Sequence, residues 1–168
     1  MNRRYFLSSS LALGGFVALS RLPLVTALAQ DKSKSTGIKK VTKTDEEWKR
    51  ILTPDQYQVL RHEGTEQPYS SPLTNLHDEG TFVCAGCELP LFSSKNKYDS
   101  GTGWPSFWKP IKKENVQERV DNKLSVTRTE VLCARCDGHL GHVFDDGPEP
   151  TGLRYCMNGV ALKFVKKS

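Results

Sequence analysis

The chain has 168 residues, the length of one domain or of one domain with a tail. Hydrophobic residues make up 37% and charged residues 26% of it, a composition that allows a packed core and argues against disorder of the whole chain. No apolar run reaches the roughly 18 to 20 residues of a membrane-spanning helix, so we do not expect an integral membrane protein.

Residues 1–29 show the three parts of an export signal. Arg3 and Arg4 precede an apolar stretch at 11–19, and residues 27–29 form a small-x-small cleavage site. The paired arginines and the weak, glycine-containing apolar stretch favour a twin-arginine signal. We therefore expect export to a bacterial periplasm or an equivalent compartment, with no stable membrane insertion after cleavage. A short amphipathic membrane anchor that stays uncleaved is the alternative.

The net charge of +5 depends on the same segment. Residues 1–29 contain three arginines and no acidic residue, so cleavage lowers the net charge to +2. This charge is too small to indicate nucleic-acid binding. Residues 30–43 are rich in Lys, Ser and Thr, and we expect a flexible linker there, or else a basic tether for anionic surfaces. The folded domain is then expected at 44–168.

Two short helices are expected at the start of this domain. Capping signals at Thr44 and Thr53, the second followed by Pro54, each open a helix. The second helix is expected to run to His62, because Gly64 stops it.

After the helices the pattern changes to short β runs separated by turn residues. The expected strands are 81–84, 89–92, 106–109, 116–120, 124–132, 142–144 and 154–165. Because helices and strands do not alternate, a parallel doubly wound sheet is not expected. The predicted fold is mainly β: a small antiparallel β-sheet domain with two N-terminal helices packed on it.

Four of the five cysteines form two Cys-x-x-Cys pairs, Cys84 with Cys87 and Cys133 with Cys136. Two such pairs can complete a tetrahedral four-sulfur shell, which is the usual structural zinc site. Such a site contributes on the order of 10 kcal/mol to folding. Two disulfides, a redox-active Cys-x-x-Cys and a zinc ribbon that binds nucleic acid are the alternatives.

The fifth cysteine, Cys156, has no partner if the other four hold a metal. Alternation along a strand puts Arg154, Cys156 and Asn158 on one face. A free thiol is only about 3% ionised at pH 7, so a nucleophilic cysteine needs a positive or proton-accepting neighbour. Arg154 is one candidate, and His139 and His142 are others if the intervening turn folds the chain back. A buried core cysteine is the alternative, and the histidines could equally be supporting or surface residues.

Trp104 is a candidate for the wall of a pocket. Gly101 and Gly103 precede it and Pro105 follows it, so the indole is held on a rigid turn. A core tryptophan is the alternative.

Several motifs together resemble one family, the type B peptide methionine-R-sulfoxide reductases. They are Trp104-Pro-Ser-Phe107, His139-Leu-Gly-His-Val-Phe144 and Arg154-Tyr-Cys-Met-Asn158, with both Cys-x-x-Cys pairs. The resemblance runs from about residue 44 to residue 164. It implies a fold of antiparallel β-sheets and the reduction of methionine-R-sulfoxide in oxidised proteins.

The resemblance also implies roles for single residues. Cys156 would attack the sulfoxide sulfur and become a sulfenic acid. His142, helped by His139 and Asn158, would supply or organise the proton for the sulfoxide oxygen. The substrate methyl group would lie in a hydrophobic pocket, and the polar end would be oriented nearby. The residues implied for these binding roles are Trp104 and Phe107 for the pocket and Arg154 for the polar end.

The metal and the reductant complete this expectation. One structural zinc ion, held far from the chemistry, is implied for Cys84, Cys87, Cys133 and Cys136. Many family members carry a second redox cysteine at the position of Thr102, which would close a disulfide onto the sulfenic acid. Without it we expect an external thiol, from a thioredoxin-like protein or a small molecule. A zinc-held binding module without catalysis and a general disulfide oxidoreductase are the competing functions.

Overall fold

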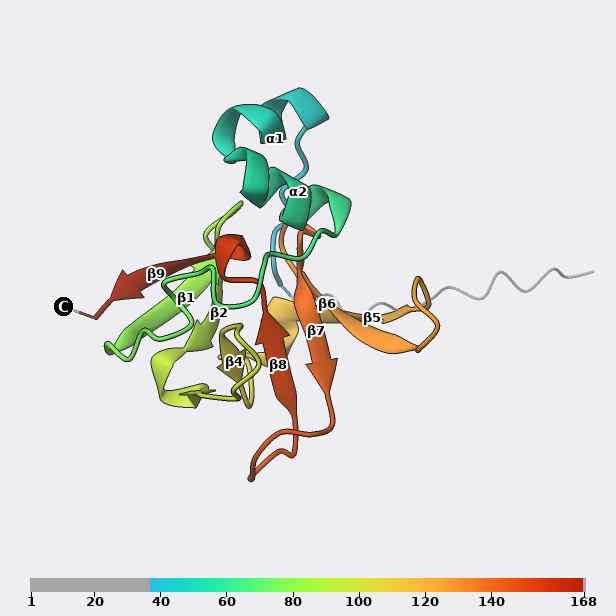
Figure 1. Ribbon diagram of the computed structural model, residues 1–168. Coiled ribbons are helices and arrows are strands. Elements are labelled where there is room, and N and C mark those ends of the chain that lie inside the picture. Colours follow the sequence, from blue (N-terminus) through green and yellow to red (C-terminus); the bar gives the residue numbers. More distant parts are fainter. Residues whose placement is uncertain (1–36, 168) are drawn as a thin grey trace, which may run out of the picture. The chain divides into compact units, whose positions relative to one another are not determined.

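The computed structural model describes residues 37–167 (Figure 1). The expected export signal at 1–29 and the first part of the expected linker lie outside the described residues. The described residues of the linker, 37–43, contact the domain: the Val41 amide donates to the Arg135 carbonyl at 2.8 Å, and Ile38 and Val41 pack against the core. Within residues 37–167 the search for a helix long and apolar enough to cross a membrane finds none.

Both predicted helices form, α1 at Asp45–Ile51 and α2 at Pro54–His62. Each begins with a complete capping box: the threonine side chain accepts from the backbone amide three residues later, and the threonine amide donates to the side chain of that residue. α2 ends at His62 as expected, although Glu63 and not Gly64 adopts the left-handed conformation after it, at φ 56°. The helices lie together at one end of the domain, above the sheets (Figure 1).

The strands form two antiparallel sheets, which confirms the predicted fold class. The three-stranded sheet has the order β2-β1-β9 and the six-stranded sheet has the order β3-β4-β8-β7-β6-β5. The strands are β1 Gly80–Cys84, β2 Pro90–Ser93, β3 Lys97–Tyr98, β4 Ser106–Phe107, β5 Val116–Asp121, β6 Arg128–Cys133, β7 His139–Phe144, β8 Arg154–Met157 and β9 Leu162–Lys166. Three short 3₁₀ turns, η1 Ser94–Asn96, η2 Lys113–Asn115 and η3 Gly159–Ala161, complete the described elements.

The long strand predicted at 154–165 is wrong, because the chain leaves one sheet at Met157 and enters the other at Leu162. The turn η3 between them is held by Glu66, whose carboxylate accepts from the amides of Gly159 at 2.6 Å and Val160 at 2.9 Å. A Cβ at residue 159 would lie 2.0 Å from Ser71 Oγ, so this position requires glycine. The side chains after Asn158 therefore do not continue the face that carries Cys156.

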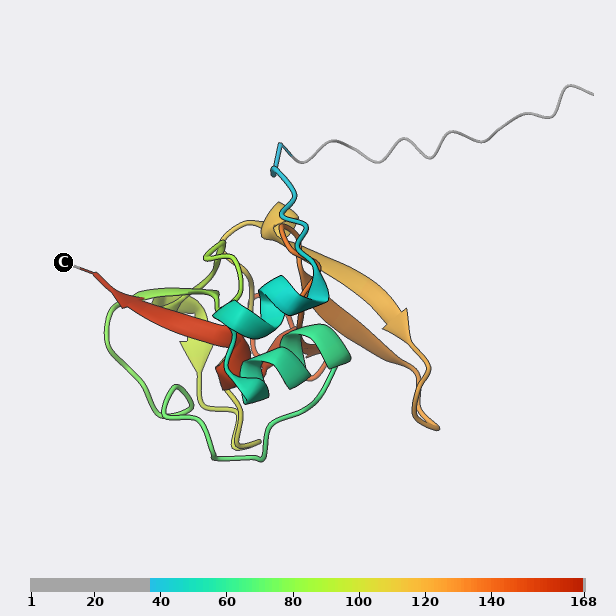
Figure 2. The same cartoon turned by 90° about the horizontal axis from the view of Figure 1, so that it is seen from above.

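Three other strand boundaries differ from the expectation by more than one residue, and the short strand β3 was not predicted. β6 begins at Arg128 and not at 124, because residues 122–127 form the loop of the β5–β6 hairpin. β7 begins three residues earlier than expected, at His139. β4 ends at Phe107, two residues early. In the view of Figure 2 the β5–β6 hairpin projects from the body of the domain.

An aromatic cluster forms the centre of the core. Phe107 stacks on Phe92 with ring centroids 4.4 Å apart and meets Phe82 edge-on at 4.9 Å. All three side chains are fully buried. Such ring pairs contribute roughly 0.5–1.5 kcal/mol each beyond the area that they bury.

Candidate active site

Cys156 lies in a row of residues that crosses the six-stranded sheet. The register pairs it with Ser106 on β4 and with His142 on β7. His142 in turn pairs with Glu130 on β6. Because directly paired residues of an antiparallel sheet share a face, the thiol and the imidazole point to the same side. The turn between β7 and β8 thus folds the chain back so that His142 stands opposite Cys156.

A small cavity of about 130 Å³ opens over this row. It is large enough for the end of a single side chain, and its lining is mostly apolar. The cavity brings together four of the predicted site residues, Cys156, His142, Asn158 and Trp104. Thr65, Arg128, Gly141 and Phe144 complete the lining.

The Cys156 thiol is half-buried and lies close to hydroxyl groups. Thr102 Oγ1 is 3.9 Å from its sulfur, and Ser100 Oγ links Thr102 at 2.8 Å to Ser106 at 2.7 Å. Burial raises the pKa of the Cys156 thiol, and contacts with Thr102 and the Arg154 guanidinium lower it in part. The thiol form therefore predominates in the free protein. The thiol must give its proton to an acceptor when it reacts.

Arg154 lies beside the cavity and does not line it. Its guanidinium forms two parallel hydrogen bonds to Asp146, both 2.8 Å, and stacks over Phe144 at 4.3 Å from the ring centroid. A guanidinium with two parallel hydrogen bonds to one carboxylate has a fixed orientation. In this structure Arg154 supplies positive charge near Cys156 and supports the cavity wall formed by Phe144.

His142 is held by an acid that the sequence patterns did not indicate. Its Nε2 lies 2.8 Å from Asp121 Oδ2, and the same oxygen accepts from Arg128 at 2.6 Å. The amide of Lys123 donates to the other oxygen at 3.0 Å, and these bonds keep the pKa of Asp121 well below its usual range. Asp121 therefore stays ionised and can stabilise a protonated His142 ring.

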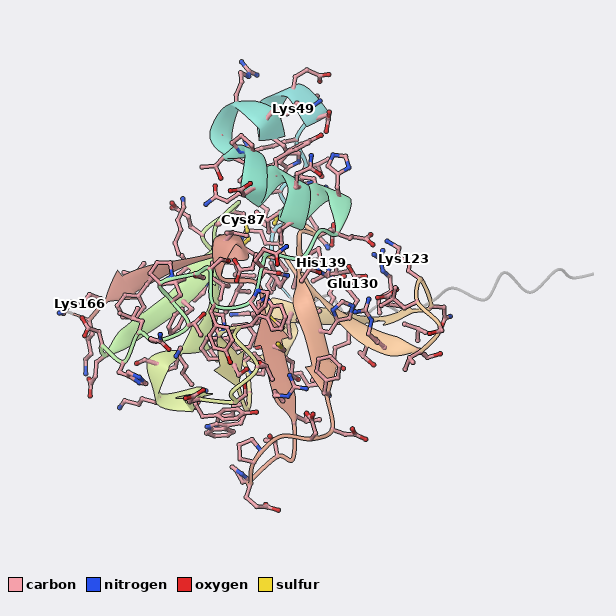
Figure 3. All side chains as sticks on the ribbon, in the orientation of Figure 1. Lys49, Cys87, Lys123, Glu130, His139 and Lys166 are labelled. Atoms are coloured by element: carbon pink, nitrogen blue, oxygen red, sulfur yellow. The ribbon has the colours of Figure 1, made fainter. Side chains whose placement is uncertain are left out.

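His139 belongs to a second, fully buried pair. Its Nδ1 lies 2.6 Å from Glu130 Oε1, and both side chains are 3% exposed (Figure 3). Arg119 neutralises Glu130 from the solvent side at 2.7 Å. Burial lowers the pKa of His139. Its ring centroid lies 5.4 Å from that of His142, and the two rings are in edge-on contact.

Glu66 joins Asn158 to Trp104. Its amide donates to Asn158 Oδ1 at 3.0 Å, and its carbonyl accepts from the Trp104 indole nitrogen at 3.2 Å. Asn158 also donates through Nδ2 to the Leu140 carbonyl at 3.1 Å. One residue far away in sequence thus sets the position of two residues of the cavity. None of the motifs in the sequence indicated this role of Glu66.

Phe107 is a correction to the predicted site. Its strand neighbour Ser106 pairs with Cys156, so the alternation of β4 turns Phe107 to the opposite face. There it is fully buried between Phe82 and Phe92. Phe107 stabilises the core beneath the site and does not line the cavity.

The four remaining cysteines form a separate cluster, to which Figure 3 points with the label on Cys87. Their sulfur atoms all lie within 4.8 Å of one another, with 3.6 Å between Cys84 and Cys136 and 3.4 Å between Cys87 and Cys133. A disulfide requires about 2.05 Å, so none is formed in this structure. Four thiolates around one zinc ion lie about 3.8 Å apart for zinc–sulfur bonds of about 2.3 Å. The donor set and its spacing therefore fit a metal ion.

Comparison with known proteins places the chain in one family. Residues 52–166 match the SelR domain. The chain is similar to proteins named peptide methionine sulfoxide reductase MsrB. The one from Leptospira interrogans is 54% identical over 127 residues, which cover 76% of this chain and 97% of the relative. The ones from Hahella chejuensis and Bradyrhizobium diazoefficiens are each 54% identical, over 74% and 81% of this chain and 90% and 97% of theirs.

Proposed function

Because the chain belongs to the SelR domain family, we propose that it reduces methionine sulfoxide in oxidised proteins and selects the R epimer at sulfur. The observation that carries the proposal is the register that sets Cys156 opposite His142 at the base of a cavity of side-chain size. The similar proteins named peptide methionine sulfoxide reductase support the substrate class.

The reaction transfers two electrons from the Cys156 sulfur to the sulfoxide sulfur. The Cys156 thiol gives up its proton as its sulfur attacks the sulfoxide sulfur, and the sulfoxide oxygen takes up a proton, so the step needs no net proton. The sulfur–oxygen bond of the substrate breaks, the hydroxyl group ends on Cys156 as a sulfenic acid, and methionine leaves.

His142 supplies this proton, since it stands across the strand pair from Cys156 and is bound by Asp121. The ionised Asp121 stabilises the imidazolium, and the orientation of the ring is fixed before the substrate binds. His139 and Asn158 support the geometry from their buried hydrogen bonds to Glu130 and Leu140.

Selection between the epimers follows from the two sides of the cavity. Trp104 offers an apolar wall for the methyl group, and His142 offers a donor for the oxygen. The S epimer exchanges these two groups, which would place the oxygen on the indole and leave a polar group without a hydrogen bond.

The test of the function is turnover of separated R and S epimers of N-acetylmethionine sulfoxide, with dithiothreitol as reductant. We expect turnover of the R epimer at least about a hundredfold faster, a ratio typical of a site that leaves a polar group of the wrong substrate unpaired. Equal rates would contradict the selection, and no turnover of either epimer would contradict the function.

The positions of the five cysteines support the reduction of the Cys156 sulfenic acid by an external thiol. Thr102 places a hydroxyl 3.9 Å from the Cys156 sulfur, where a second thiol would close a disulfide. The other four cysteines are gathered in the metal cluster. A thioredoxin-like protein or a small thiol attacks the sulfenic acid, water leaves, and a second thiol releases the mixed disulfide.

A sulfenic-acid reagent, added to the protein after one turnover without reductant, tests this step. We expect one label per chain, on Cys156, because no nearby thiol removes the sulfenic acid. The matched variant Thr102→Cys should lose the label to an intramolecular disulfide. Rapid formation of a disulfide in the unaltered chain, seen by mass spectrometry, would contradict the external route.

Zinc and export complete the proposal. We assign one structural zinc ion to the four clustered cysteines, where it would link the turn after β1 to the turn after β6 and supply folding energy. We also propose export through a twin-arginine signal at residues 1–29, on the basis of Arg3 and Arg4 and the cleavage pattern.

A further inference from the structure

Three hydroxyl groups form a hydrogen-bonded chain that ends at the Cys156 sulfur. Ser106 lies on β4, where it pairs with Cys156. Ser106 Oγ is 2.7 Å from Ser100 Oγ, which is 2.8 Å from Thr102 Oγ1 in the loop between β3 and β4. Thr102 Oγ1 in turn lies 3.9 Å from the sulfur. At its other end the chain reaches the Trp104 carbonyl, to which Ser106 donates at 3.3 Å.

The loop that carries Thr102 is held by the segment that follows α2. The Gly101 carbonyl accepts from the Tyr69 hydroxyl at 2.7 Å, and the Gly103 carbonyl accepts from the Tyr69 amide, also at 2.7 Å. A Cβ at residue 103 would lie 2.9 Å from the Tyr69 ring, so the loop packs closely against this segment. Because the backbone is held on both sides of Thr102, its oxygen stays beside Cys156 while its O–H bond is free to rotate.

The direction of the chain follows from its protons, because each hydroxyl has only one to donate. Ser106 donates to the Trp104 carbonyl, so its contact with Ser100 must use the Ser100 proton. The contact between Ser100 and Thr102 must then use the Thr102 proton. Thr102 has none left for the sulfur and can only accept from the Cys156 thiol. While Cys156 is a thiol, the chain therefore donates from the sulfur toward the carbonyl.

Loss of the thiol proton reverses this direction. A thiolate only accepts, so Thr102 turns its proton to the sulfur, Ser100 donates to Thr102, and Ser106 donates to Ser100. The O–H bonds rotate and no heavy atom has to move. The contact that is lost is the one between Ser106 and the Trp104 carbonyl, which at 3.3 Å is longer than the two contacts between hydroxyls. It is exchanged for a hydrogen bond to a charged atom, which is the stronger kind.

We propose that Thr102 is a catalytic residue whose hydroxyl donates to the Cys156 sulfur whenever that sulfur carries negative charge. This inference rests on the proposed function and deepens it. The donation serves the attack on the sulfoxide sulfur. It serves again in the last step, when a second thiol attacks the outer sulfur of the mixed disulfide and Cys156 leaves as a thiolate. The hydroxyl chain thus stabilises Cys156 both as nucleophile and as leaving group.

The test compares Thr102→Val, which keeps the shape of the side chain without the hydroxyl, with Thr102→Ser, which keeps the hydroxyl. The first measurement is the rate at which iodoacetamide alkylates Cys156 at neutral pH, followed by mass spectrometry. We expect Thr102→Val to slow this rate about three- to tenfold, and Thr102→Ser to restore it to within about twofold. Without the hydrogen bond less thiolate is present, and the higher nucleophilicity of a more basic thiolate offsets part of the loss.

The second measurement is the single-turnover reduction of N-acetylmethionine-R-sulfoxide without reductant, for which we expect the same order of the variants. Thr129→Val is the matched control and should leave both rates unchanged. Thr129 pairs with Val143, the neighbour of His142, so it faces the side of the sheet away from Cys156. The other titratable groups around the sulfur are the same in every variant: Arg154, Asp146, His142, Asp121 and Tyr98.

Alkylation of Thr102→Val at the unaltered rate would show that the hydroxyl does not donate to the sulfur. An equal loss in Thr102→Ser would assign the effect to the shape of the side chain, and an equal loss in Thr129→Val would assign it to the fold. Each of these results would overturn the proposal. Alkylation needs no sulfoxide, so failure of the unaltered protein to reduce the substrate would contradict the proposed function alone.

Discussion

Replacing Cys156 by serine is expected to lower the reduction of methionine-R-sulfoxide by roughly 10⁴-fold or more, to the background rate. Serine keeps the size of the side chain but offers a hydroxyl that ionises far less readily than a thiol and does not form a sulfenic acid. Because Cys156 is the one cysteine outside the metal cluster, no other thiol can take its place. The measurement is turnover of N-acetylmethionine-R-sulfoxide with dithiothreitol in excess.

Two controls separate chemistry from folding in this experiment. Cys156→Ser should keep the circular dichroism spectrum, the Tm and the bound metal of the unaltered protein, because the side chain is half-buried and lies outside the cluster. A variant with normal structure and more than a hundredth of the activity would show that another group is the nucleophile.

Removal of the metal is expected to unfold the domain. A structural zinc site contributes on the order of 10 kcal/mol, comparable to the whole stability of about 5–15 kcal/mol of a typical domain. Cys84 and Cys133 are fully buried and lie at the ends of β1 and β6, which belong to different sheets. Four thiolates within 4.8 Å of one another repel each other, and without a bound cation no positive charge offsets this repulsion.

The metal prediction is measured as zinc content and Tm before and after a strong chelator, and in the variant Cys133→Ser. We expect about one zinc per chain, a loss of the cooperative transition after chelation, and aggregation or unfolding of Cys133→Ser. Cys156→Ser is the matched control, since it removes a sulfur without touching the cluster. A metal-free protein that keeps its Tm would contradict the structural role.

The local parts of the fold were predictable because their causes lie within a few residues. Thr44 and Thr53 form the capping boxes that the spacing indicates, and both helices follow. The short spacing within each Cys-x-x-Cys pair already brings its two sulfur atoms together. The four-cysteine cluster therefore required only that the two pairs meet. The motif residues Cys156 and His142 also meet as the resemblance implies.

The sequence-based predictions were wrong or incomplete where a segment far away in the sequence determines the local structure. The break at Gly159 depends on Glu66, 93 residues away, whose carboxylate takes the amides that a continuous strand would have paired. Phe107 lies in the core because the register of β4 against β8 sets which residue faces Cys156. Asp121 joins the site only through a hydrogen bond across 21 residues of chain.

The sequence by itself determined the chemical groups that are present: one cysteine apart from two Cys-x-x-Cys pairs, the two histidines of one motif, and Thr102 where the resemblance implies a second redox thiol. These properties depend on residue identity and short spacing, which folding does not alter. Only the tertiary structure decided that Asp121 holds His142 and that Glu66 joins Asn158 to Trp104. The reason is that these contacts join segments far apart in the sequence. On the strands, moreover, side chains alternate, so a shift of one residue in register would turn Asp121 or His142 to the other face.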